Sequence, residues 1–452
     1  MRALVLVDGE HYPPVTRWAI EVARQRGVDV VAAVLVGGVE KLGAGGTPEF
    51  GVPLRGGADR TEAVGSAIDE LRPDLVLDLS DEPVLGYRER MEMAAVILGR
   101  GIPYAGADFR FDPPPALPPP AGVPTLAVIG TGKRTGKTAI AGELARRASH
   151  LGLAPIVIAM GRGGPAVPQI AEAGSVGLET LLELVRSGEH AASDYLEDAL
   201  TTGVPTIGAR RAGGGLAGAP YVSNVQEAVA LAAARRPGLL ILEGSGASIP
   251  PIAWDAGVLV VQADCPLEYL TGYLGPYRLL RADLGLVTMV GSPVLGPEAL
   301  SQLTAHLRRA LGDARVVLTD FRPVPLADVR GRDVFFATTA PRIAAAGQVR
   351  HLEAASGVRV VGWSARLADR AGLAEDMDAA AEYEVLLTEL KAAAVDVACE
   401  RAMARGAEVV FVDNRPEVVG ADDGDLETAL TELIDLAVAR GIDRGAAEGT
   451  EG

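Results

Sequence analysis

The residues with the clearest chemical signature lie between Gly130 and Thr138. An apolar stretch, Leu126–Ile129, runs directly into this segment. A strand that enters a glycine-rich turn and then a helix brings backbone N–H groups and a helix N-terminus to one anion. In such a loop the lysine reaches the β- and γ-phosphates of a nucleotide, and the next hydroxyl binds Mg²⁺. The predicted phosphate ligands are Gly130, Thr131, Gly132, Lys133, Arg134, Thr135, Gly136, Lys137 and Thr138.

Within this loop three side chains are predicted to be catalytic and one to hold metal. Lys137 and Thr138 occupy the lysine and hydroxyl positions of the phosphate-loop pattern. Lys133 and Arg134 are extra cations, predicted to act on phosphate; the alternative is that they are solvated loop charges. The pattern is a variant, because Thr131 stands where a glycine is usual.

A second carboxylate is expected at the end of a neighbouring strand, where it would help to hold Mg²⁺. The aliphatic run Leu239–Leu242 delivers Glu243 to the carboxyl edge of the sheet. Glu243 is therefore predicted to be catalytic and a metal ligand, against the alternative of an ordinary strand-terminal acid. Asp264 is a weaker candidate, since it equally suits a helix cap.

Three arginines are predicted to bind an anionic substrate at the same edge. Arg162 follows the strand Pro155–Met160 inside Gly-Arg-Gly-Gly, and Arg210 and Arg211 precede three glycines. The planar guanidinium suits phosphate and carboxylate, and glycines allow backbone amides to approach. Arg162 is also predicted to be catalytic. The alternative is a mobile loop with solvated arginines.

Polar residues at two strand ends of the N-terminal region are further predicted substrate ligands. Short polar groups at the carboxyl end of a strand lie where open α/β sheets bind ligands. For His11 the alternative is a helix-capping role. The residues are Asp8, Glu10, His11, Arg88 and Arg90.

The nucleotide is predicted to be ATP. Guanine-specific phosphate-loop proteins usually carry Asn/Thr-Lys-x-Asp, and outside the loop the lysines are Lys41 and Lys391. Neither lies in that pattern. Lysine is scarce overall, since four of the 42 basic residues are lysines. Two of the four lie in the phosphate loop.

These residues need a framework of alternating strands and helices. The predicted organisation is an N-terminal α/β domain (1–111), a proline-rich linker (112–124) and a phosphate-loop core (125–300), followed by a C-terminal α/β part (301–444). A flexible tail is predicted at 445–452. The chain has 452 residues, about three times a typical ~150-residue domain. The fold class is α/β, with a parallel-sheet core like that of phosphate-loop nucleoside triphosphatases, an N-terminal α/β domain and a C-terminal α/β extension.

Two segments are predicted from composition alone. Gly203–Pro220 is glycine-rich and is expected to be irregular. Asp376–Arg405 is alanine-rich and is expected to be one long helix.

Composition limits the function classes. The net charge of −17 and a pI of about 4.9 argue against a nucleic-acid binder. No apolar run reaches the ~18–20 residues of a membrane helix. The run Ala3–Val7 stops at Asp8, so no signal peptide is expected and the default location is the cytoplasm. Two cysteines do not make a disulfide framework.

Four motifs together resemble one known family, the cyclic 2,3-diphosphoglycerate synthetases. They are Val7–Val15, Leu77–Arg90, Ile129–Thr138 and Leu242–Gly246, in the family's order. The similarity covers nearly the whole chain, and the two N-terminal motifs are more specific than the phosphate loop. The resemblance implies ATP- and Mg²⁺-dependent joining of the two phosphates of 2,3-diphosphoglycerate into an intramolecular anhydride, with release of ADP and phosphate.

Two other function classes stay open from the residues. One is a phosphate-loop kinase or ATP-dependent ligase acting on another small acid. The other is a nucleotide-controlled switch or chaperone. The polar strand ends of the N-terminal region argue against this class. A homodimer is the expectation from the base rate for enzymes.

Overall fold

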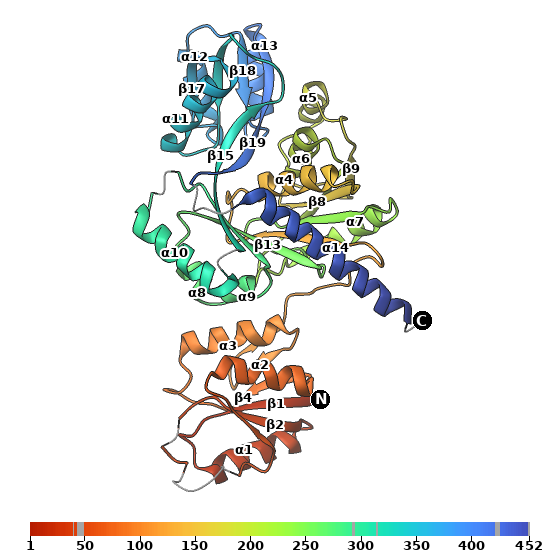
Figure 1. The fold of residues 1–452 in the computed structure, drawn as a ribbon, viewed down its shortest axis with the longest axis vertical. Helices are drawn as coiled ribbons and strands as arrows, with labels where there is room; N and C mark the ends of the chain where they lie inside the picture. Colours follow the sequence, from red (N-terminus) through yellow and green to blue (C-terminus); the bar gives the residue numbers. More distant parts are fainter. Residues whose placement is uncertain (39, 43–48, 292–293, 313–314, 421–424, 451–452) are drawn as a thin grey trace. The chain divides into compact units, whose positions relative to one another are not determined.

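The computed structural model describes the chain except residues 39, 43–48, 292–293, 313–314, 421–424 and 451–452. The described chain forms two compact units (Figure 1). The first comprises residues 1–115 with two short later segments, 216–218 and 266–281. The second holds the remainder.

The first unit is a mixed sheet with helices, ordered β3-β2-β1-β4-β5-β6. Its central strand β1 (Arg2–Val7) is buried after the first residue and pairs in parallel with β2 and β4. Parallel pairing buries both faces, which explains the unbroken aliphatic run. The other elements are β2 (Asp29–Leu35), β3 (Leu54–Arg55), β4 (Leu75–Asp78), β5 (Tyr104–Ala105), β6 (Arg110–Phe111), α1 (Pro13–Gln25), α2 (Arg60–Leu71), α3 (Tyr87–Gly99), α8 (Glu268–Thr271) and α9 (Gly275–Leu279).

The second unit is built on a long sheet whose first part is the phosphate-loop core, ordered β11-β10-β8-β12-β7-β13-β14-β15. From β10 to β15 neighbouring strands pair in parallel, with β7 in the middle. The strands are β7 (Thr125–Gly130), β8 (Pro155–Gly161), β9 (Gln169–Ala171), β10 (Thr206–Ala212), β11 (Val222–Ser223), β12 (Leu239–Glu243), β13 (Ala256–Gln262), β14 (Leu284–Thr288) and β15 (Val316–Pro325).

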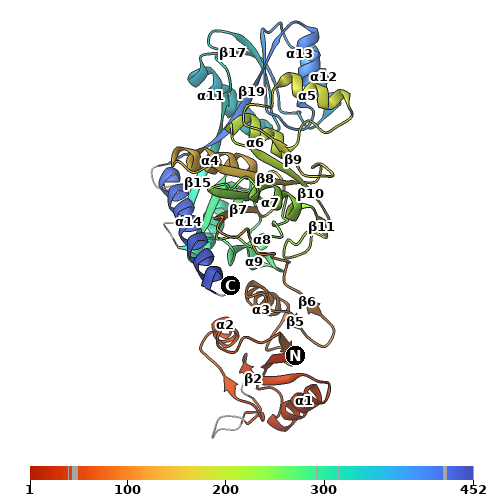
Figure 2. The same ribbon diagram turned by 90° about the vertical axis from the view of Figure 1, so that its right-hand side faces the viewer.

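Helices α4 (Lys137–His150) and α14 (Leu426–Thr450) pack together against this core, as Figure 2 shows. Leu126 and Val128 of β7 meet Leu144 of α4 and Leu430 of α14 in one hydrophobic cluster. Burial of these aliphatic side chains fixes the helix that begins at the phosphate loop. The remaining core helices are α5 (Leu178–Arg186), α6 (Asp194–Thr202), α7 (Val225–Ala233) and α10 (Gly296–Leu311).

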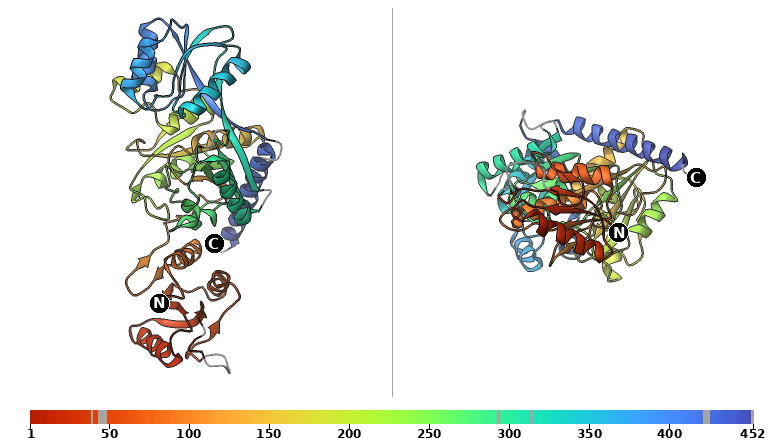
Figure 3. Two further views of the ribbon diagram at one scale, coloured as in Figure 1. Left: turned by 90° about the vertical axis from the view of Figure 1, so that its left-hand side faces the viewer. Right: turned by 90° about the horizontal axis from the view of Figure 1, so that it is seen from below.

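The sheet continues into the C-terminal part through a long antiparallel pair, β15 with β19 (Glu408–Val418), visible in Figure 1 and, turned by 90° about the vertical axis, in the left view of Figure 3. Beyond it the order is β19-β18-β16-β17, all parallel. The elements are β16 (Asp333–Ala337), β17 (Arg359–Ser364), β18 (Val385–Thr388), α11 (Arg342–His351), α12 (Arg370–Ala379), α13 (Glu400–Ala404) and the π-helical turns η2 (Leu352–Ser356) and η3 (Ala394–Cys399).

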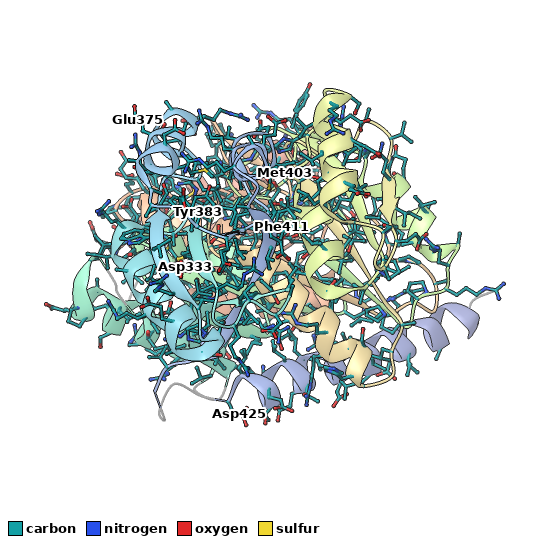
Figure 4. The ribbon with its side chains drawn as sticks, turned by 90° about the horizontal axis from the view of Figure 1, so that it is seen from above. Asp333, Glu375, Tyr383, Met403, Phe411 and Asp425 are labelled. Atoms are coloured by element: carbon teal, nitrogen blue, oxygen red, sulfur yellow. The ribbon has the colours of Figure 1, made fainter. Side chains whose placement is uncertain are left out.

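The C-terminal part and helices α5 and α6 share one hydrophobic core. Leu181 of α5 and Leu196 of α6 cluster with Leu373 and Leu390. In Figure 4 these two helices lie beside the strand that carries Phe411, β19. The C-terminal sheet is therefore packed onto the phosphate-loop core and belongs to the same unit.

The α/β class predicted from the sequence is confirmed, but two local predictions are wrong. Gly203–Pro220 contains the strand β10, buried over its first four residues. Gly208 has no room for a side chain, because an added Cβ would lie 2.6 Å from the Tyr195 ring. The glycine that suggested an irregular segment is thus a close-packing position within a strand.

The predicted helix Asp376–Arg405 is broken by strand β18. Its residues Val385–Thr388 are fully buried and pair with both β16 and β19. Pairing on both sides outweighs the helical propensity of the surrounding alanines. Helix α12 ends before the strand, and η3 and α13 follow it.

At the C-terminus, the backbone stays helical through Thr450, where the composition predicts a flexible tail from residue 445. Residues 451 and 452 of that predicted tail lie outside the described residues. In the proline-rich segment, Leu117 forms an isolated bridge with Ile252. Among the helices described, none combines the length and the apolar character needed to cross a membrane.

Candidate functional site

Four neighbouring strands bring the phosphate loop and three other predicted site residues to one sheet edge. Strands β10, β8, β12 and β7 are consecutive and parallel. At or just after their carboxyl ends stand Arg211, Arg162, Glu243 and the loop Thr131–Gly136. This edge is where open parallel sheets bind ligands.

The loop depends on glycine at two positions. An added Cβ on Gly130 would meet the Val260 carbonyl at 3.1 Å and Thr135 Oγ1 at 2.9 Å. Gly136, the residue before α4, has φ +90°, and a Cβ there would overlap the Phe321 ring. Glycine therefore permits both the turn and the start of the helix. Thr131, which replaces the usual glycine, is buried and accepts a contact from Cys265 Sγ at 3.5 Å.

The Lys137 side chain folds back onto the phosphate loop, so that its ammonium contacts loop residues. It donates to the Gly132 carbonyl at 2.8 Å and to Thr135 Oγ1 at 3.3 Å. Lys137 is 6% exposed, and burial lowers the pKa of its ammonium to about 8 despite the opposing charge of Glu243. A buried cation next to loop backbone amides is arranged to receive an anion.

Thr138 and Glu243 form the predicted metal-binding pair. Thr138 Oγ1 donates to Glu243 Oε1 at 2.7 Å. The other oxygen, Glu243 Oε2, is buried without a hydrogen-bond partner. Burial, with added repulsion from Asp194, raises the pKa of Glu243 to about 8. A hydroxyl and a carboxylate with one unused oxygen suit a hard divalent cation, which prefers oxygen ligands.

Two arginine side chains meet beside the Gly244–Gly246 loop. A Cβ on Gly246 would lie 3.4 Å from Arg211 Nη2 and 3.7 Å from Arg162 Nη2. Arg211 donates to the Ser245 and Gly213 carbonyls, both at 2.7 Å, while its buried Nε has no partner. Burial and the charge of Arg162 lower the pKa of Arg211. Like charges held this close favour an anion between them.

The other predicted cations are placed differently. Arg210 donates its Nε to the Gly164 carbonyl at 3.0 Å, and so braces the loop after β8. Lys133 and Arg134 are exposed at the tip of the phosphate loop, with Arg134 at φ +62°. Asp264 accepts a hydrogen bond from the Leu295 amide at 2.8 Å and holds a turn.

Helix α6 adds an acidic face that sequence reasoning missed. Asp194, Glu197 and Asp198 have i, i+3 and i+4 spacing, so they project from one side of the helix. Asp198 is fully buried, and neither of its carboxylate oxygens has a hydrogen-bond partner. Burial, and then repulsion from Glu243, raises its pKa well above the ordinary value. The spacing was the signal available in the sequence.

The polar edge of the N-terminal sheet is bonded within itself. Asp8 Oδ1 accepts from the amides of Glu10 and His11 at 3.0 Å and contacts His11 Nδ1 at 2.8 Å. Its other oxygen accepts from the Asp81 amide at 2.7 Å. Burial raises the pKa of Asp8, but these hydrogen bonds outweigh it and the net shift is downward. Asp8 therefore organises its own loop.

Arg90 is engaged in a similar way. Asp78 accepts from Arg90 Nε at 3.1 Å and from the Tyr104 hydroxyl at 2.7 Å. Arg88, by contrast, is exposed on α3. A substrate role for Glu10, His11 and Arg88, and for the bonded Asp8 and Arg90, stays a prediction.

Three family models cover most of the chain. Their descriptions are the N-terminal domain (residues 2–112), the P-loop domain (residues 125–320) and the C-terminal domain (residues 325–415) of cyclic 2,3-diphosphoglycerate synthetase. The phosphate loop, Glu243, the three arginines and α6 all lie within the second match.

Relatives with the same name span nearly the full length. The cyclic 2,3-diphosphoglycerate synthetase of Rubrobacter xylanophilus is 45% identical over 432 residues, covering 95% of this chain and 97% of the relative. That of Thermococcus sibiricus is 41% identical (95% and 98% covered), and that of Methanothermus fervidus is 38% identical (97% of each).

Among solved structures, LpxK from Aquifex aeolicus in complex with ATP is similar at a TM-score of 0.42 and 15% identity, covering 78% of this chain and 96% of that one. The family assignment rests on the sequence matches. Because the models and the relatives agree along almost the whole length, this chain belongs to the cyclic 2,3-diphosphoglycerate synthetase family.

Proposed function

We propose that this protein uses ATP to cyclise 2,3-diphosphoglycerate, giving cyclic 2,3-diphosphoglycerate, ADP and phosphate. Family membership supports the reaction. The observation that carries it to this chain is the meeting of Arg162 and Arg211 on the strand ends next to the phosphate loop. This pair would serve as a second anion site beside the phosphate loop of Lys137.

The substrate's charge explains why such a cluster is needed. Each phosphomonoester carries about −1.5 to −2 near pH 7, so with its carboxylate the substrate carries roughly −4 to −5. A protein of net charge −17 repels such a molecule at long range. Attraction must come from nearby cations, and Lys137, Arg162 and Arg211 supply them.

The phosphate loop would hold ATP. Backbone amides of Gly130–Thr138 would surround the β-phosphate, with Lys137 between the β- and γ-phosphates. Lys133 and Arg134, exposed at the loop tip, would close over the nucleotide. ATP is favoured over GTP because the chain lacks the Asn/Thr-Lys-x-Asp pattern.

Thr138 Oγ1 and the two oxygens of Glu243 would hold Mg²⁺, which fits the unused buried oxygen of Glu243. When bound, the ion would neutralise charge on the β- and γ-phosphates. The Thr138–Glu243 hydrogen bond keeps both side chains in place.

The cyclisation needs two in-line displacements. An oxygen of one substrate phosphate attacks the γ-phosphorus of ATP, and ADP leaves. An oxygen of the other substrate phosphate then attacks the first substrate phosphorus, and inorganic phosphate leaves as the ring closes. Lys137 and the Arg162–Arg211 pair would position the two phosphates and offset their repulsion, which is most of the catalytic task in phosphoryl transfer.

Phosphorus NMR of the protein with Mg·ATP and 2,3-diphosphoglycerate tests this proposal. We expect a ring anhydride, with ADP and phosphate each formed in equal amount to it. A stable phosphorylated product without free phosphate would show a kinase instead. Slow ATP hydrolysis unaffected by the phosphoglycerate would point to a switch protein.

A further inference from the structure

A lysine from the C-terminal part reaches the acidic face of α6. Lys391 is one of the four lysines of the chain and lies outside the phosphate loop. It follows β18, and its Nζ lies 3.1 Å from Glu197 Oε1. The Glu197 side chain is 12% exposed, so this ion pair is mostly removed from solvent on the glutamate side.

The backbone that carries Lys391 is firmly held. The neighbouring Glu389 accepts hydrogen bonds from Thr338 Oγ1 at 2.6 Å, from the Thr339 amide at 3.0 Å and from Asn414 Nδ2 at 2.9 Å. Leu390 is buried in the core that the C-terminal part shares with α5 and α6. These contacts hold the segment that carries Lys391 against the C-terminal sheet, on the side that packs on α6.

A second ion pair joins the same two regions. Arg146 of α4, the helix that begins at the phosphate loop, lies 3.0 Å from Asp413 of β19. Arg146 also bonds Glu143 on its own helix at 2.7 Å. Both α4 and α6 thus form ion pairs with residues at the carboxyl edge of the C-terminal sheet.

The Lys391–Glu197 pair lies in a strongly negative neighbourhood. Asp194 and Asp198 flank Glu197 on α6, and Glu243 stands close enough for these carboxylates to repel it. Helix α6 contacts the helix that begins at the phosphate loop, because Nη1 of Arg146 on α4 lies 3.5 Å from the Thr201 carbonyl of α6. The Lys391–Glu197 pair is therefore linked to the phosphate-loop helix through α6.

We propose that Lys391 is a positioning residue for nucleotide binding: by pairing with Glu197 it offsets the negative charge of α6, so that the phosphate loop accepts Mg·ATP. The C-terminal part would thus contribute to the nucleotide site through α6. A nucleotide carrying several negative charges cannot bind well beside an uncompensated buried carboxylate. The inference rests on the proposed nucleotide site and adds to it a role for Lys391 in nucleotide binding.

Calorimetric titration with Mg·ATP, without phosphoglycerate, tests the inference on the full chain. We expect Lys391→Met to weaken binding about tenfold and Lys391→Arg to keep it within about threefold. The double variant Lys391→Met/Glu197→Gln should return to within about threefold of wild type, because the carboxylate has gone with its partner. All titrations are run well below each variant's melting temperature, so that global unfolding does not contribute to the measured affinity.

Matched variants separate the outcomes. Arg401→Met removes a surface ion pair with Asp378 in the same region and should leave the affinity unchanged. Unchanged binding by Lys391→Met, or a double variant as weak as Lys391→Met, would overturn the inference. If Lys391→Met does not fold, the single variant Glu197→Gln decides. It should bind Mg·ATP at least as tightly as wild type, and weaker binding would contradict the inference. Failure of the wild-type protein to bind Mg·ATP would instead contradict the proposed nucleotide site.

Discussion

Two sheet edges of this protein carry clusters of charged residues, and they differ in how those residues are satisfied. At the N-terminal edge Asp8 accepts hydrogen bonds from three residues, and Asp78 is bonded to Arg90 and Tyr104. At the phosphate-loop edge Glu243 Oε2, Arg211 Nε and both oxygens of Asp198 are buried without a hydrogen-bond partner.

Unsatisfied buried polar atoms cost stability, and they persist where binding or catalysis needs them. The contrast therefore separates an edge whose polar groups are bonded to one another from the edge that we propose as the ligand site. Substitutions should act on stability at the first edge and on activity at the second.

The largest effect is expected from Lys137→Ala. Loss of the buried ammonium should lower kcat by about a thousandfold, because it removes a charge that stabilises the transferred phosphate. The melting temperature should not fall, since burial already opposes the charged form of this lysine. Steady-state kinetics and thermal melts measure both quantities. Normal turnover would refute the assignment of the site.

The arginines should separate into two kinds. Arg162→Ala and Arg211→Ala should each raise the KM for 2,3-diphosphoglycerate about 10- to 100-fold, as expected for a lost charged hydrogen bond. Arg210→Ala is the matched control, because this arginine braces the Gly164 carbonyl. It should change KM much less. Equal effects of all three would show that the Arg162–Arg211 pair is not a distinct anion site.

The N-terminal edge should respond through stability. Asp8→Ala should lower the free energy of unfolding by about 2–3 kcal/mol, because it leaves the amides of Glu10, His11 and Asp81 without their acceptor. Denaturant unfolding measures this loss. A variant with unchanged stability and strongly reduced activity would instead make Asp8 a direct substrate ligand.

The smallest effect should come from Asp198→Asn, as a change in pH dependence. Burial raises the pKa values of Glu197 to about 7, of Glu243 to about 8 and of Asp198. Groups with raised folded pKa values add stability at low pH and lose it as the pH rises through those values. The ligand-free protein should therefore lose stability between about pH 4.5, the ordinary carboxyl value, and about pH 8.

Asp198→Asn removes one of these buried carboxyls, so the fall in melting temperature across that range should be shallower than in wild type. Lys137, with its pKa lowered to about 8, affects stability above this window and does not disturb the comparison. A slope as steep as that of wild type would show that Asp198 is not one of the groups responsible.

How well the sequence predicts these two edges depends on how far apart along the chain the interacting residues lie. Strand, glycine turn and helix around Lys137 are local, so the phosphate loop could be read directly from residue order. Arg162 and Glu243 were also predicted at one edge, because buried parallel strands end on the same side. The approach of Arg162 and Arg211 to each other beside Gly246 could not be predicted, since it depends on how the loops pack.

What the sequence did not reveal is long-range. Strand β18 exists because β16 and β19 pair with it on both sides, whereas its local composition favours helix. The residues around Lys391 do not fit a guanine-recognition pattern, and its sequence neighbours indicate no other role. Its partner Glu197 lies 194 residues earlier in the chain, and only folding brings the two together.

The central claim, that the substrate phosphate itself receives the γ-phosphoryl group, is tested most directly with oxygen-18. 2,3-Diphosphoglycerate labelled in its non-bridging phosphate oxygens is incubated with unlabelled Mg·ATP, and the released phosphate is examined by mass spectrometry. The two displacements predict that each phosphate released carries a single labelled oxygen from the substrate. Phosphate without label would contradict the account, because the γ-phosphoryl group would then have gone to water or to the protein.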